Sequence, residues 1–74
     1  MQLRPVAFRT VKRKLEAAGF TQLRRRGGSH VKFVKISPGE TRTAVVPKHR
    51  EVATGTLRSI LRQAGLSAEQ FEEL

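Results

Sequence analysis

Hydrophobic residues in the first twenty positions follow the spacing of an amphipathic helix. Four of them recur every three or four positions and form one apolar face: Phe8, Val11, Leu15 and Ala18. Pro5 suits the first turn of a helix, because its ring fixes φ and its missing amide proton is not needed there, so we expect the helix to begin at Pro5. Gly19 is typical of a left-handed helix end, with Phe20 folding back on the last turn.

Three short runs with strand character come next, at residues 21–26, 31–36 and 41–46. The second run is the richest in β-branched and aromatic residues, which favour strands. Its apolar phase slips between Phe33 and Val34, which predicts a bulge or burial of both faces near its end.

Turn residues separate these runs. In the first run Leu23 is the only apolar residue, which indicates a strand exposed on one face. Gly27-Gly28 predicts a turn before the second run, and Ser37-Pro38-Gly39-Glu40 predicts one after it. Pro47 ends the third run, because proline cannot donate a hydrogen bond to a neighbouring strand.

The last third of the chain predicts two helices. Thr54 or Thr56 can cap the first of them. Its buried stripe falls on four residues at helical spacing: Leu57, Ile60, Leu61 and Ala64. Gly65 ends this helix. Ser67-Ala68-Glu69-Gln70 has the form of a capping box, and Phe71 anchors the short final helix.

The order helix, strand, strand, strand, helix, with a short C-terminal helix, predicts an α+β fold. We expect a three-stranded antiparallel sheet with helices on one face and the other face open to a ligand. Residues 1–74 are expected to form one domain, because no linker, repeat or low-complexity segment divides them.

Charge is distributed unevenly along this chain. Fifteen Lys and Arg residues against six acidic residues give a formal net charge of +9. Residues 1–37 hold ten basic residues and one acidic residue, whereas residues 38–74 hold five of each. A field of one sign on half of a small domain costs self-repulsion, which favours a polyanionic partner. Nucleic acid is the leading interpretation, and an acidic protein or a membrane surface are the alternatives.

The composition also bears on the compartment. Cysteine is absent, which excludes disulfides and thiolate metal sites. No apolar run approaches the ~18 residues that span a bilayer, and no signal-peptide pattern opens the chain. We therefore expect a soluble protein that remains in the cytoplasm.

Residue types required by several common catalytic sites are scarce. No glycine pattern matches a phosphate loop, and no Ser, His and acid trio indicates acyl transfer. Aspartate is absent, and only Glu16 and Glu40 of the six glutamates lie in the first forty residues, so a two-metal nuclease lacks its carboxylates. Two histidines without cysteines or clustered acids make a poor zinc site. We expect no metal and no cofactor.

Metal-free acid and base chemistry on RNA is compatible with this composition. RNA carries its own nucleophile, the 2′-hydroxyl, so cleavage needs a base for that proton, an acid for the leaving 5′-oxygen and cations beside the phosphate. Imidazole suits the first two roles, because its ordinary pKa of ~6.5 lies near working pH. His30 and His49 are the only histidines. The basic residues around them in sequence are Arg24, Arg25, Arg26, Lys32, Lys48 and Arg50.

Structural roles also explain these residues. A histidine after a glycine turn is often an exposed strand residue, and the arginines at 24–26 can form a solvated edge that blocks sheet aggregation. Basic residues of the first helix are interpreted as its solvated face. The chain has four Phe and no Tyr or Trp, and three of the Phe suit the core, so aromatic platforms for base stacking are few.

Four motifs occur in a characteristic order along the chain. They are the helix end Ala18-Gly19-Phe20, the Gly28-Ser29-His30 opening of the second strand, the Val46-Pro47-Lys48-His49 end of the third, and the run from Gly55 to Ser67 followed by Glu69 and Phe71. In this combination the chain resembles the HicA toxin family over essentially its whole length.

The resemblance implies a fold similar to the double-stranded RNA-binding domain. It also implies a ribonuclease that cleaves messenger RNA, halts growth and is held in check by a HicB-type antitoxin. The catalytic histidine of the family lies in the Gly-Ser-His motif, here His30. Many members carry a second histidine directly after it, whereas this chain has Val31, which weakens any scheme with two adjacent imidazoles. His49, in the Pro-x-His element, is assigned a structural or substrate-positioning role.

We therefore predict a toxin endoribonuclease, an mRNA interferase, in which His30 is the general acid or base. Alone it is expected to be a monomer, and with its antitoxin a hetero-oligomer. The residues predicted to contact RNA are Arg24, Arg25, Arg26, Gly28, Ser29, Lys32, Lys48 and His49. One alternative is a non-catalytic RNA-binding module with a basic sheet face. Another is an interaction protein whose basic face meets an acidic partner, which would compete with RNA and cover His30.

Overall fold

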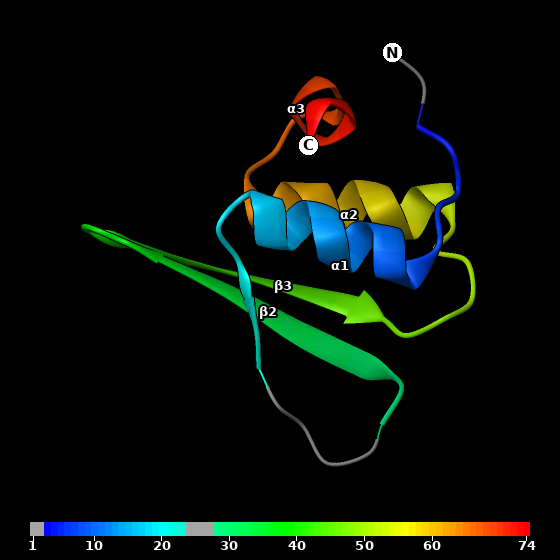
Figure 1. The fold of residues 1–74 in the computed structure, drawn as a ribbon, viewed down its shortest axis with the longest axis horizontal. Coiled ribbons are helices and arrows are strands. Elements are labelled where there is room, and N and C mark those ends of the chain that lie inside the picture. Colours follow the sequence, from blue (N-terminus) through cyan, green and yellow to red (C-terminus); the bar gives the residue numbers. More distant parts are fainter. Residues whose placement is uncertain (1–2, 24–27) are drawn as a thin grey trace.

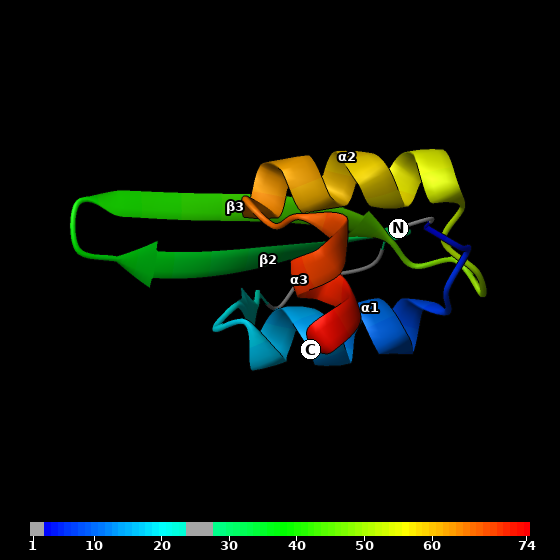
Figure 2. The same ribbon diagram turned by 90° about the horizontal axis from the view of Figure 1, so that it is seen from above.

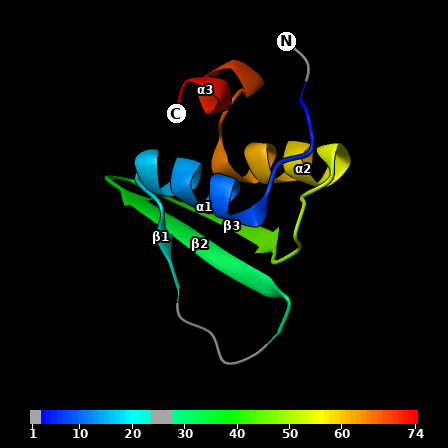
Figure 3. The same ribbon diagram turned by 45° about the vertical axis from the view of Figure 1, so that its right-hand side comes forward.

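The computed structural model describes residues 3–23 and 28–74. The elements follow in the order α1 (Phe8–Ala17), β1 (Thr21–Gln22), β2 (His30–Ser37), β3 (Glu40–Pro47), α2 (Thr54–Ala64) and α3 (Ala68–Glu73). The strands form an antiparallel sheet of order β1-β2-β3. Helices α1 and α2 cover one face of the sheet, with α3 beyond them (Figures 1 and 3). The α+β prediction is confirmed, and the arrangement is consistent with a double-stranded RNA-binding-domain-like fold.

Helix α1 begins at Phe8, so the predicted start at Pro5 is wrong. The reason is a tertiary contact, since Val6 and Val52 form an antiparallel bridge in which each amide donates to the other's carbonyl. The bridge holds the chain extended up to the N-cap residue Ala7, which has a ψ of 149°. Sequence-distant pairing therefore overrides the preference of proline for the first helical turn.

The end of α1 is as predicted. Gly19 has a φ of +100°, in the left-handed region that glycine adopts without steric cost. The amide of Phe20 donates to the carbonyl of Leu15 at 2.9 Å, and that of Gly19 to Glu16 at 3.0 Å. This is the double hydrogen bond of a Schellman motif, and it turns the Phe20 side chain into the core, where it is buried.

Strands β2 and β3 form a hairpin with a continuous register, from His30 opposite Pro47 to Ser37 opposite Glu40. The predicted bulge or two-sided burial is wrong, because Val34 is only half-buried and Ile36 is 80% exposed. Val34 and Ile36 alternate with the buried Val31 and Phe33, so they lie on the face of the sheet that the helices leave open. Figure 2 shows in addition that the hairpin reaches beyond the helices. The predicted turn at residues 37–40 is confirmed.

The first strand is shorter than expected within the described residues. β1 contains Thr21 and Gln22, which pair with Val34 and Phe33. The amide of Leu23 donates to the carbonyl of Lys32 at 2.8 Å, and its side chain is 41% exposed. Residues 24–27, which complete the predicted strand and part of the glycine turn, lie outside the described residues.

Neither Thr54 nor Thr56 caps α2. Its N-cap is Ala53, which follows the bridged Val52 directly and makes no side-chain capping bond. The helix therefore begins at Thr54, one residue too early for a threonine to cap it. The capping box of α3 is confirmed, because the Ser67 hydroxyl accepts from the Gln70 amide at 3.0 Å and the Gln70 side chain accepts from the Ser67 amide at 2.8 Å.

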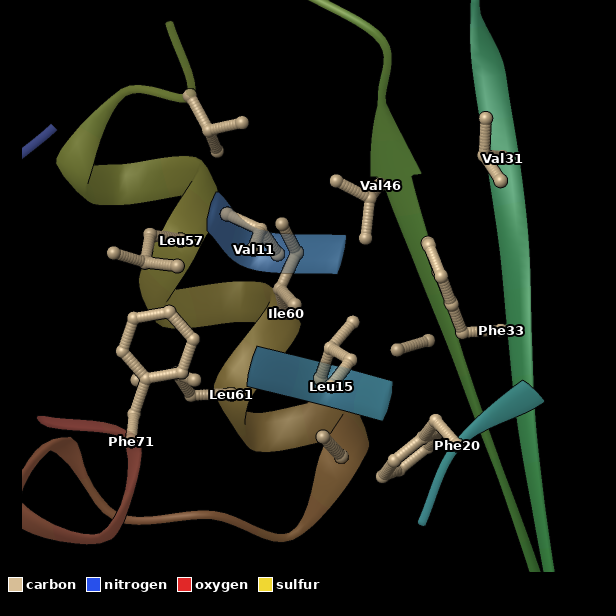
Figure 4. Packing of buried hydrophobic residues seen from close by; sticks show 13 residues of the cluster. Val11, Leu15, Phe20, Val31, Phe33, Val46, Leu57, Ile60, Leu61 and Phe71 are labelled. Atoms are coloured by element: carbon tan, nitrogen blue, oxygen red, sulfur yellow. The ribbon is translucent and has the colours of Figure 1, made fainter. Parts of the chain in front are cut away.

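The core lies between the sheet and the helices (Figure 4). Phe33 and Val46 of the sheet face Leu15 of α1 and Ile60 of α2, and Phe71 of α3 packs on the far side of α2. The predicted stripe of α2 is confirmed, because all four of its residues are buried: Leu57, Ile60, Leu61 and Ala64. Among the described residues, no helix has the length and apolarity to cross a membrane.

Candidate active site and nucleic-acid interface

His30 is the first residue of β2, at one end of the sheet. Gly28 precedes it with a φ of +83°, a conformation that an L side chain rarely adopts, so the chain can turn sharply into the strand. His30 is exposed, whereas the next residue, Val31, is buried against the helices. Since side chains alternate along a strand, the imidazole of His30 lies on the open face of the sheet.

The loop after β3 is held beside His30. His30 lies opposite Pro47 in the hairpin, and the Lys48 amide donates to the carbonyl of Ser29. The Ser29 hydroxyl oxygen lies 3.3 Å from Nδ1 of His30. The histidine therefore has the hydroxyl of the residue before it nearby, and the loop after β3 begins beside it with Lys48.

Lys32 lies on the same face of the sheet as His30. It is two residues further along β2, it is exposed, and it pairs with Val45 of β3. The buried residues Val31 and Phe33 alternate with His30 and Lys32 and point to the helices. The open face thus presents an imidazole and an ammonium group on one strand.

Lys48 and His49 line a cleft of about 500 Å³ at the same end of the molecule. The other residues that line it are Ala7, Phe8, Arg9 and Arg50. Figures 1 and 3 show why these segments meet: the start of α1, the end of β3 and the start of β2 lie at one end of the fold. The Val6–Val52 bridge joins the segment before α1 to the loop after β3.

Phe8 and Arg9 were not predicted to be members of this cleft. Phe8 was expected in the core and Arg9 on a solvated helix face, because helical periodicity reports only which face of α1 is apolar. Phe8 is indeed packed against the core, but it is only half-buried. No local sequence motif predicts that these residues lie near Lys48, because the long-range Val6–Val52 bridge brings them together.

The remaining predicted site residues fall into two groups. Gly28 and Ser29 adjoin His30 and are exposed. Arg24, Arg25 and Arg26 lie outside the described residues, so their contacts stay a prediction. In the described part of the chain, no three His, Cys, Asp or Glu side chains gather as a metal site requires.

A family model described as the HicA toxin of bacterial toxin–antitoxin systems matches residues 8–66 of the 74-residue chain. The chain belongs to the HicA toxin family. The match begins at the first residue of α1 and extends past the end of α2, so it includes the first three HicA motifs and the fourth as far as residue 66; Ser67, Glu69 and Phe71 lie beyond it. This HicA-family protein is a toxin of a toxin–antitoxin system, and the predicted family resemblance is confirmed. The comparison with curated proteins gave no match.

Proposed function

We propose that this toxin is a metal-independent endoribonuclease that cleaves messenger RNA, with His30 as the general acid or base. The observation that carries the proposal is the placement of His30, which is exposed on the open sheet face with Lys32 on the same strand and the backbone of Lys48, in the loop after β3, bonded to the residue before it. Family membership supports a toxic activity, and the basic half of the chain supports a polyanionic substrate.

The chemistry requires two proton transfers at one phosphodiester. The 2′-oxygen attacks phosphorus as its proton passes to a base, the P–O5′ bond breaks, and the leaving 5′-oxygen takes a proton from an acid. The products are a 2′,3′-cyclic phosphate and a 5′-hydroxyl end. His30 performs one of these transfers, and the ammonium groups of Lys32 and Lys48 offset the charge that builds on the phosphorane.

The RNA contacts follow the placement of the cations. In the proposal, Gly28 and Ser29 lie against the scissile nucleotide beside His30. Lys48 and His49, in the loop after β3, bind the RNA strand. Arg24, Arg25 and Arg26 add their charge to RNA capture. Messenger RNA as substrate places the protein in the cytoplasm, where a HicB-type antitoxin neutralises it.

Replacing His30 with Ala tests the catalytic role. We expect cleavage of a labelled RNA to fall by about 10²-fold or more, the usual contribution of a positioned acid or base, with the circular dichroism spectrum unchanged. His49→Ala is the matched control, because it removes the only other histidine and is expected to weaken RNA binding more than turnover. Undiminished cleavage by His30→Ala contradicts the proposal.

Removing metal ions from the buffer and removing the 2′-hydroxyl from the RNA test the metal-free mechanism and the identity of the nucleophile. Cleavage should persist in EDTA, and loss of activity in EDTA that added Mg²⁺ restores would contradict the metal-free mechanism. A single 2′-deoxy substitution at the cleaved nucleotide should abolish cleavage there and leave binding intact. If wild-type protein shifts RNA on a gel and never shortens it, the function is that of a non-catalytic RNA-binding module.

We further propose that the antitoxin inhibits by covering His30. The His30→Ala protein should bind the antitoxin as wild type does, because occlusion needs the surface and not the imidazole. Amide exchange at residues 28–32 should slow in the complex. A crystal structure of the complex with His30 open to solvent would exclude inhibition by occlusion.

A further inference from the structure

The cleft between the start of α1 and the loop after β3 concentrates positive charge. Arg9, Lys48 and Arg50 line it together with His49, and no carboxylate of residues 3–23 or 28–74 does so. Among the residues that the structure describes, none of the three cations forms an ion pair with an acidic side chain. Three unneutralised cations around one hollow repel each other, so the structural stability of the fold does not account for them. Such a cluster favours an anionic ligand.

The cleft also has an aromatic wall. Phe8 lines it, and the centroid of the Phe8 ring lies 6.4 Å from that of Phe33 at an interplanar angle of 44°. Phe33 is fully buried, so Phe8 is supported from the core side while remaining half-exposed. An aromatic ring with one accessible side is the usual stacking platform for a nucleic-acid base.

We propose that this cleft binds one unpaired nucleotide of the RNA substrate, with its base against Phe8 and its flanking phosphates among Arg9, Lys48 and Arg50. A volume of about 500 Å³ suits a single nucleotide, since small-molecule sites measure ~300–1,000 Å³. Bases of a duplex are stacked and paired, so only a single strand can present one to Phe8. The inference rests on the proposed function and states in addition where the RNA strand lies beyond the scissile bond.

The cleft adjoins the candidate catalytic residue. Lys48 lies in the cleft and donates its amide to the carbonyl of Ser29, the residue before His30. In the proposal, an RNA strand whose phosphodiester reaches His30 continues into the cleft at a neighbouring nucleotide. Positioning of that nucleotide would fix the scissile bond against His30.

RNA binding by the 74-residue His30→Ala protein, measured by fluorescence anisotropy with a single-stranded 12-nucleotide RNA, tests the proposal. Arg9→Gln and Arg50→Gln, alone and combined, should reduce the slope of log affinity against log salt by about 0.7 for each phosphate that the variant no longer neutralises. Arg62→Gln is the matched control, because it removes an exposed arginine of α2 that does not line the cleft and should leave the slope unchanged.

Phe8→Leu separates stacking from charge. Leucine keeps an apolar side chain against Phe33 but has no aromatic face, so affinity should fall by about fivefold or more with the salt slope unchanged. A 12-unit abasic RNA chain should bind Phe8→Leu and its parent equally. If Phe8→Leu does not fold, NMR of the parent protein makes the same test. The chemical shifts of the Phe8 ring protons should change on addition of the RNA and not on addition of the abasic chain.

Several outcomes overturn the inference. Cleft variants that bind RNA as tightly as Arg62→Gln, with the same salt slope, would contradict it. So would a duplex RNA that binds more tightly than the single strand and whose affinity Phe8→Leu does not change. If the parent protein binds no RNA at all, the proposed function fails with it. If the wild-type protein cleaves an RNA that the cleft variants bind with normal affinity, the proposed function stands but the cleft has no part in it.

Discussion

The backbone amide of Lys48 donates a hydrogen bond to the carbonyl of Ser29, and this bond joins the two motifs that hold the histidines. It extends the β2–β3 pairing one step beyond His30 and Pro47. The bond therefore ties the Gly28-Ser29-His30 turn to the Pro47-Lys48-His49 loop. Lys48 has two separable roles, one through its backbone and one through its ammonium group.

Lys48→Pro and Lys48→Ala should separate these roles. Both remove the cation and should weaken RNA binding alike, but only proline removes the amide donor to Ser29. We expect Lys48→Pro to cost about 1–2 kcal/mol more in the free energy of unfolding and to lower the turnover number further. Urea unfolding and single-turnover cleavage measure the two effects. Equal stability and turnover in the two variants would show that the hydrogen bond between Lys48 and Ser29 contributes neither to stability nor to the position of His30.

Ser29→Ala tests the hydroxyl beside His30. The two side chains are exposed and their atoms lie 3.3 Å apart, so the contact is a weak one that helps to orient the ring. A hydrogen bond of ~0.5–1.5 kcal/mol corresponds to a fall in turnover of about two- to tenfold, far smaller than that of His30→Ala. Single-turnover rates with saturating protein measure it. A loss as large as that of His30→Ala would make Ser29 itself a participant in proton transfer.

Gly65→Ala should destabilise the fold, and Gly55→Ala should not. Gly65 ends α2 with a φ of +72°, and a Cβ there would lie 2.6 Å from Cζ of Arg42. The left-handed conformation alone costs a non-glycine residue about 1–2 kcal/mol. Gly55 is helical with open space around a Cβ, so alanine should gain about 0.5 kcal/mol. Thermal unfolding of the two variants measures the difference, and similar melting temperatures would contradict it.

Local patterns were sufficient to predict the fold class and most element types. Helical periodicity located the stripe from Leu57 to Ala64, and turn residues located the hairpin at Pro38-Gly39, because both depend on residues close in sequence. Two helix starts were wrong for one shared reason. The Val6–Val52 bridge sets the extended segments before α1 and α2, and pairing between such distant residues leaves no local signal.

The candidate site divides in the same way. His30 is found from a short motif and its exposure follows from strand alternation with Val31. Phe8 and Arg9 could not be found, since only the bridge brings the start of α1 to the loop that carries His49. The phase slip after Phe33 predicted a bulge or burial of both faces, but Ile36 is exposed, because it lies on the face of the sheet that the helices leave open.

A basic residue of α1 that was predicted to lie on the solvated face has a structural role instead. Nζ of Lys14 donates to the carbonyls of Phe71 at 2.9 Å and Glu72 at 3.2 Å. It also lies 4.9 Å from the centroid of the Phe71 ring. These carbonyls are at the C-terminal end of α3, where a cation also interacts favourably with the helix dipole. Lys14 therefore fastens α3 to α1.

Lys14→Met should lower the free energy of unfolding by about 1–2 kcal/mol, because methionine keeps an apolar stem but cannot donate to the carbonyls of α3. Lys12→Met is the control with the same change in charge. Lys12 forms a partly exposed ion pair with Glu16 at 2.8 Å, which contributes ~0.5 kcal/mol or less. Urea unfolding measures the two losses. Equal losses would mean that burial of Phe71 alone holds α3, and faster amide exchange confined to residues 68–74 in Lys14→Met would confirm the fastening.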